Sequence, residues 1–199
     1  MNLSRTARIV LWGFMGFGLS FIYVPLILVV INSFNKNKSF NWPPTGFTTM
    51  WWTKAASNSG VKDAILLSFI TATFATIIAL VLGSLAAAAI ARYSFFGRDV
   101  ISLMFVLPIA LPGIVTGIAL NNVFTNFFGG LTFFTIIIGH ATFCVVVVFN
   151  NVAARYRRMG ASFEEASMDL GANRLTTFRL VTFPMIRNAL VAGGLLSFG

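Results

Sequence analysis

Long uncharged stretches alternate with short charged segments along this 199-residue chain. A helix needs about 20 apolar residues to cross a bilayer core of roughly 30 Å, so the longer stretches are long enough to span a membrane. The run from Val100 to Ala154 has room for two spans, with turn signals between them at Asn121-Asn122 and again at Asn126 to Gly130. The pattern therefore predicts membrane spans over 9–33, 64–91, 100–124 and 131–154, and a fifth over 188–199.

The last of these stretches, Asn188 to Gly199, is too short to cross the bilayer by itself. We therefore expect the chain to be part of a longer membrane protein that completes the fifth span. Arg5 and Arg8 ahead of an apolar run would also suit a cleavable signal peptide. The uncharged run from Ile9 to Asn35 is much longer than the apolar core of a usual signal peptide, which favours a retained first span.

Composition supports a membrane protein, because 57% of the residues are apolar and only 10% are charged. Soluble domains are about a quarter charged, so this composition excludes an ordinary cytosolic enzyme. The predicted fold class is all-α, a polytopic transmembrane helix bundle. Residues 1–60 are expected to form a first span with an outer loop, and residues 61–199 the core of the bundle.

The net charge of +9 would suggest a nucleic-acid partner in a soluble protein, but here the basic residues lie between the predicted spans. With the N-terminus on the inside, all ten arginines fall on the inner side and all four lysines on the outer side. An excess of basic residues on the cytoplasmic side is typical of membrane proteins. The charge therefore predicts a cytoplasmic N-terminus, and a lipid bilayer rather than nucleic acid as a partner.

Residues 155–187 form a sizeable polar segment, which this topology places in the cytoplasm. Ser162 and Glu165 have the S-x-x-E spacing of a capping box, in which each side chain bonds to the other residue's backbone amide. Glu164 and Glu165 also lie in the first turn, where the helix dipole favours anions. We therefore expect a short helix over Phe163–Leu170.

The same segment contains signals for a second short helix. Gly171 suits the left-handed residue that ends a helix, Asn173 suits the N-cap of the next one, and Pro184 is expected to disturb that helix before the chain re-enters the membrane. Two such helices have too little surface to make a core of their own, so we expect them to dock against a separate protein. The first helix has an apolar face with helical spacing, made of Phe163, Ala166 and Leu170.

This segment resembles the EAA loop, E-A-A-x3-G-x9-I-x-L-P, of permease subunits of binding-protein-dependent ABC importers. The matching residues are Glu165-Ala166-Ser167, Gly171, Val181 and Phe183-Pro184. Ser167, Val181 and Phe183 depart from the pattern, but the small residues, the glycine and the proline keep their places. Longer runs over 107–117, 139–144 and 166–172 are similar to the spermidine/putrescine subfamily.

The resemblance implies a type I ABC importer permease with six core spans in a bacterial cell (inner) membrane. Its implied partners are a second permease subunit, two ATPase subunits that use the ATP, and a periplasmic or extracellular solute-binding protein; no cofactor is implied for this chain. The loop would sit in a groove of the ATPase and transmit nucleotide-driven closure to the pore. The residues assigned to this ATPase-coupling loop are Ser162, Glu164, Glu165, Ala166, Ser167, Asp169, Gly171, Ala172 and Pro184.

Four residues inside the predicted spans are candidates for the pore or its gate: Pro108, Pro112, Gly113 and His140. Proline kinks are common in membrane helices, so a purely structural role for the prolines stays open. His140 is ionisable within an uncharged run, and packing or hydrogen bonding is its alternative role.

A lone histidine and a lone cysteine predict no metal site. Gly83, Gly113 and Gly117 are small residues that would let helices approach closely.

The favoured function is a non-catalytic permease subunit for polyamines, whose solute is recognised by a separate binding protein. The alternatives are a permease for another small solute, such as ferric iron or an amino-acid-like cation, and an ion-coupled secondary transporter. A secondary transporter predicts charged residues within the spans, and all five acidic residues lie outside them. The chain has no G-x-x-x-x-G-K-[ST] nucleotide motif and no plausible catalytic set, so ATP would be bound by another subunit.

Overall fold

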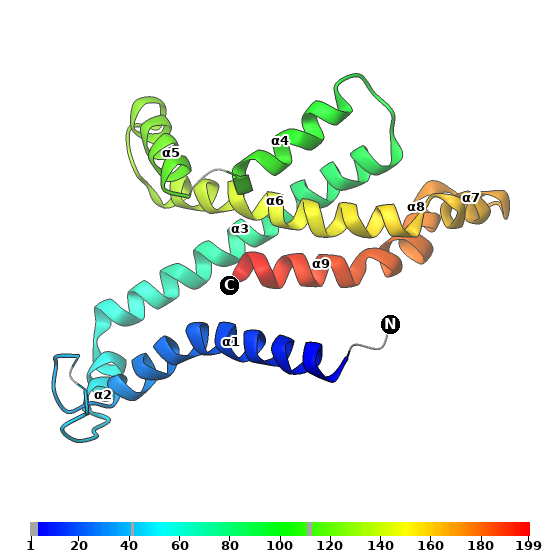
Figure 1. The fold of residues 1–199 in the computed structure, drawn as a ribbon. Coiled ribbons are helices and arrows are strands. Elements are labelled where there is room, and N and C mark those ends of the chain that lie inside the picture. The colour runs from blue at the N-terminus through cyan, green and yellow to red at the C-terminus, as the bar shows by residue number, and fades with distance from the viewer. Residues whose placement is uncertain (1–3, 41, 111–112) are drawn as a thin grey trace. The chain divides into compact units, whose positions relative to one another are not determined.

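The computed structural model describes residues 4–40, 42–110 and 113–199. The regular structure of these residues is helical, apart from one isolated antiparallel bridge between Asn35 and Phe47. This confirms the predicted all-α class. The helices in chain order are α1 (Arg5–Ser33), α2 (Met50–Ser57), α3 (Ser59–Arg92), α4 (Arg98–Ala110), α5 (Gly113–Phe128), α6 (Phe133–Met159), α7 (Ser162–Asp169), α8 (Arg174–Thr177), the π-helix η1 (Phe178–Thr182) and α9 (Phe183–Phe198) (Figure 1).

The chain divides into two compact units, Met1–Ala64 and Ile65–Gly199. In the first unit, α1 is an apolar helix of 29 residues with a mean hydropathy of 2.4. The indole N–H of Trp51, in α2, donates to the carbonyl oxygen of Asn35 at 2.9 Å. This bond holds α2 beside the end of α1.

Among the described residues, four helical runs are long and apolar enough to cross a membrane: α1, α3, α6 and the run Arg174–Phe198. The last of these joins α8, η1 and α9 into one helix of 25 residues. Large apolar side chains on the outside of these helices are exposed, including most of those on α1. Exposed apolar surface of this extent requires lipid or another subunit to cover it.

The expected third span over 100–124 is not a single helix in the structure. α4 ends at Ala110 and α5 begins at Gly113, and Figure 1 shows the two running in different directions. Pro108 lies in the last turn of α4, and a proline has no backbone N–H to donate within a helix. Hydropathy reports how apolar a segment is, and not whether its helix continues. Pro112 lies outside the described residues.

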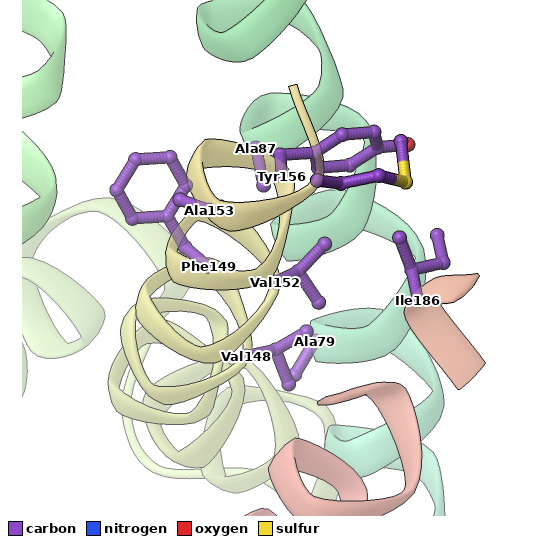
Figure 2. Packing of buried hydrophobic residues seen from close by; sticks show 9 residues of the cluster. Ala79, Ala87, Val148, Phe149, Val152, Ala153, Tyr156 and Ile186 are labelled. Carbon is purple, nitrogen blue, oxygen red and sulfur yellow. The ribbon is translucent and has the colours of Figure 1, made fainter. Parts of the chain in front are cut away.

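The core of the second unit forms where α3, α6 and α9 meet. Figure 2 shows Ala79 and Ala87 of α3 and Ile186 of α9 around the side chains of Val148 and Val152 on α6. Both valines are completely buried. α4 joins the same core through Phe105, whose ring stacks on a phenylalanine of α6 with centroids 4.3 Å apart.

Small residues allow these helices to approach closely, as predicted for Gly83. A Cβ atom added to Gly83 would lie 2.8 Å from the carbonyl oxygen of Val145, a distance that real side chains do not adopt. On α9, a Cβ atom at Gly193 would lie 3.2 Å from the Cα atom of Val148. Neither Gly113 nor Gly117 has such a neighbour among the described residues. The close approach is therefore between α3, α6 and α9.

Candidate functional site

The segment between α6 and α9 turns sharply at Gly160, whose φ is +69°. α7 then begins at Ser162, with Ala161 as its N-cap and no side-chain bond to that cap. The predicted capping box between Ser162 and Glu165 was therefore wrong, because the helix starts one residue earlier than expected and Ser162 lies inside it. The expected placing of Glu164 and Glu165 in the first turn is confirmed.

Gly171 ends α7 in the left-handed conformation that the sequence predicts, with a φ of +89°. Its N–H donates to the carbonyl oxygen of Met168 at 2.9 Å, and the N–H of Ala172 donates to that of Ser167 at 3.2 Å. These two bonds form the Schellman arrangement, which satisfies carbonyl groups that the end of a helix would leave unpaired.

The second helix begins where expected but does not end where expected. The side chain of Asn173 accepts a hydrogen bond from the N–H of Thr176 at 2.9 Å, which confirms its role as an N-cap. Pro184 does not break the helix, because the chain makes a π-helical turn over Phe178–Thr182 and continues as α9. A wider turn moves the preceding carbonyl away from the proline ring, so the helix continues although Pro184 has no N–H to donate.

The face of α7 that points toward the rest of the protein is polar. Glu164 accepts a hydrogen bond from the hydroxyl of Thr182 in η1 at 2.7 Å, and its other oxygen lies 2.7 Å from Nε of Arg92, the last residue of α3. The hydroxyls of Ser167 and Thr177 lie 3.1 Å apart. Thr177 and Thr182 are buried, so these contacts occur in a largely dry place.

Arg92 also reaches α6. Its Nη2 donates to the carbonyl oxygen of Gly160 at 2.6 Å, and its guanidinium lies over the ring of Tyr156, 4.9 Å from the centroid. The side chains of Arg92 and Glu164 are only 18% and 15% exposed, so solvent screens this ion pair less than one on the open surface. The sequence gives no local sign of this pair, because 72 positions separate its two residues.

The opposite face of the segment is apolar and exposed. Phe163 is 56% exposed, Leu170 is 90% exposed, and Leu175 at the start of α8 is 75% exposed. Ala166 is exposed as well, so the predicted apolar face of the first helix points to solvent in this chain. Glu165, Asp169 and Pro184 are also exposed. Figure 1 shows α7 and α8 beyond the ends of α6 and α9, where another protein can reach them.

The pore candidates lie elsewhere. His140, on α6, is exposed and lines a hollow with polar residues from three helices; these are Ser68 and Thr71 of α3, Cys144 of α6 and Ser197 of α9. Sequence reasoning missed these four neighbours, since single serines and threonines give no signal in an apolar run. Gly113 is the first residue of α5.

The architecture is that of a helical membrane subunit with a protruding two-helix loop, and comparisons with known proteins agree. A family described as "Binding-protein-dependent transport system inner membrane component" matches residues 79–199. The chain therefore belongs to this family.

Two curated relatives are permeases of Escherichia coli (strain K12). The chain is 34% identical over 192 residues to "Spermidine/putrescine transport system permease protein PotC", which covers 96% of this chain and 72% of that protein. It is 33% identical over 189 residues to "Putrescine transport system permease protein PotI", with 91% and 66% covered. These relatives confirm the resemblance to the polyamine subfamily.

A solved structure has the same fold. It is described as "Crystal structure of a bacterial ABC transporter involved in the import of the acidic polysaccharide alginate", and it matches with a TM-score of 0.59 and 20% sequence identity. The match covers all of this chain and 72% of that one. It confirms the fold of an ABC importer permease.

Proposed function

We propose that this chain is a permease subunit of an ATP-driven importer for polyamines such as spermidine and putrescine. The family and the two curated permeases support the permease role and the solute class. In this proposal the chain forms part of the translocation path together with a second permease subunit. A separate binding protein delivers the solute and sets its identity.

One observation supports a role for α7 in coupling to the ATPase: its polar face points toward the rest of the chain, and its apolar face points to solvent. Its inner face is polar and bonded to the rest of the chain, while Phe163 and Leu170 are exposed. Exposed apolar residues on a protruding segment are typical of a surface that another protein covers. We infer that an ATPase subunit covers them, with Glu165 and Asp169 at the polar rim of the contact.

Transport in this proposal works by alternating access. ATP binding draws the two ATPase subunits together, and the loop helices that rest on them move with them. The helices of the second unit are packed against this loop, so the same movement opens the path to the outside and admits solute. ATP hydrolysis takes place in the partner subunits.

We further propose that the protein lies in the inner membrane of a bacterium with its N-terminus in the cytoplasm. The ten arginines on one side of the predicted spans and the four lysines on the other support this orientation. It places α7 and α8 on the side where ATP is available.

Uptake of solute by the reconstituted transporter tests the proposal. The protein is purified together with its second permease, ATPase and binding-protein partners, and the complex is placed in proteoliposomes. We expect ATP-dependent uptake of labelled putrescine or spermidine, and none of ferric iron or arginine. Uptake of one of these competitors in place of polyamines would correct the solute, and uptake without ATP and the ATPases would favour a secondary transporter.

The docking surface is tested in the same complex with Phe163→Glu. A buried charge at the centre of an interface costs more than about 2 kcal/mol, so the amount of ATPase that co-purifies should fall about thirtyfold. Phe96→Glu is the matched control, because Phe96 is a fully exposed aromatic residue in the loop before α4. Undiminished ATPase binding by Phe163→Glu would show that α7 is not the docking element.

A further inference from the structure

We propose that Arg92, Glu164 and Thr182 form a joint that carries the movement of α7 into the membrane helices α3 and α9. The inference rests on the proposed function and adds to it the residues that transmit the motion. It concerns contacts within this chain, behind the surface that an ATPase would cover.

The joint is defined by three helices that meet at one carboxylate. Glu164 lies on α7, and its two oxygens contact Thr182 at the end of η1 and Arg92 at the end of α3, both at 2.7 Å. η1 runs without a break into α9. A displacement of α7 therefore pulls on α3 and α9 through a single side chain.

The arginine extends the joint to α6. Its Nε forms an ion pair with Glu164, its Nη2 donates a hydrogen bond to the carbonyl oxygen of Gly160, and its face lies over Tyr156. The planar guanidinium allows these contacts in different directions at once, which a lysine ammonium does not reproduce. The group thus holds the start of α7 at a set position relative to α3 and α6.

Two further observations distinguish this pair from an incidental surface contact. Across the residues that the structure describes, Arg92 and Glu164 form the only salt bridge, although the chain has ten arginines. Thr182 is the last residue of the π-helical turn, and π-helical turns occur frequently at functional sites. Thr182 is 5% exposed, whereas its neighbour Phe183 is 46% exposed, so the threonine faces inward.

The experiment measures solute taken up per ATP hydrolysed by the full transporter in proteoliposomes. We expect Arg92→Glu and Glu164→Arg to retain the ATPases, because Phe163 and Leu170 are untouched, and to lower uptake per ATP about tenfold or more. The combined variant Arg92→Glu with Glu164→Arg restores the opposite charges and should return the ratio to within about threefold of wild type. Arg98→Glu, at the first residue of α4, is the control and should leave the ratio unchanged.

Milder variants keep the test decisive where a charge reversal prevents folding. Thr182→Val removes the hydroxyl and keeps the shape, and Arg92→Lys keeps the charge and loses the planar geometry. Each is expected to lower uptake per ATP several-fold while the rate of ATP hydrolysis stays near wild type. Wild-type uptake per ATP in both milder variants would overturn the joint and leave the docking proposal intact. A wild-type chain that binds no ATPase would instead overturn the proposed function, and the joint with it.

Discussion

At the scale of single residues, the loop between α6 and α9 depends on a few positions with special backbone demands. Gly171 has a φ of +89°, and its two neighbouring hydrogen bonds close α7 and turn the chain toward α8. An added Cβ atom would meet nothing within 4 Å. Glycine is therefore required at this position by the backbone conformation, and not by a lack of space for a side chain.

We expect Gly171→Ala to destabilise the loop by about 1–2 kcal/mol, because a side chain in the left-handed region crowds the backbone. Gly171→Asn should cost less, since asparagine tolerates this conformation better than alanine. The measurement is the apparent melting temperature of the purified full-length protein. Gly113→Ala is the control, as that position is also open but has no positive φ. Equal effects of alanine and asparagine would contradict this explanation.

At the scale of helices, the second unit depends on how closely α3, α6 and α9 approach. Gly83 and Gly193 both face Val148, which is completely buried between them. Helices in membranes associate largely through such close packing, because lipid is as apolar as the helix surfaces. The position of each glycine therefore determines which helix faces can meet.

Gly83→Ala tests this packing. The new Cβ atom would lie 2.8 Å from the backbone oxygen of Val145, so α3 and α6 must move apart, at a cost of about 1–3 kcal/mol. Gly117→Ala adds the same atom on α5, where nothing lies within 4 Å, and should leave the melting temperature unchanged. Thermal unfolding in detergent compares the two variants. A loss of stability confined to Gly117→Ala would reverse the assignment.

At the scale of the whole molecule, the proposed transport cycle requires a defined orientation in the membrane. Three lysines lie between α1 and α3, and the fourth, Lys62, lies in the first turn of α3. The arginines lie at the start of α1, around the loop between α3 and α4, and in or beside the segment after α6. In the proposed orientation, which follows the positive-inside rule, α7 and α8 lie in the cytoplasm.

Labelling of single cysteines checks this orientation. In a Cys144→Ser background, Lys62→Cys and Phe96→Cys introduce thiols at exposed positions before and after the α3 span. A membrane-impermeant maleimide added to intact spheroplasts should label the first variant, and should label the second only after the membrane is opened. The opposite labelling pattern would place the N-terminus outside and remove the loop from the ATPases.

Local signals account for what could be predicted. The apolar runs of α3 and α6, the N-cap at Asn173 and the left-handed Gly171 each follow from residues within a few positions of one another. The start of α7 was missed by one residue because its N-cap is Ala161, a residue type without a capping side chain, which sequence signals do not single out. Hydropathy does not show where the run over 100–124 changes direction, because a proline-rich apolar run has the same hydropathy whether its helix continues or breaks.

By itself, the sequence determined that this chain is a helical membrane protein, and it predicted two short helices in the polar segment after α6. Hydropathy, charge asymmetry and helix caps act over short distances along the chain, so they can be read without knowing the fold. Only the tertiary structure decided that Glu164 binds Arg92 and Thr182, that Gly83 meets Val145, and that a π-helical turn carries the chain past Pro184. These contacts join residues distant in sequence or depend on how helices pack, and their energies exist only once the helices have come together.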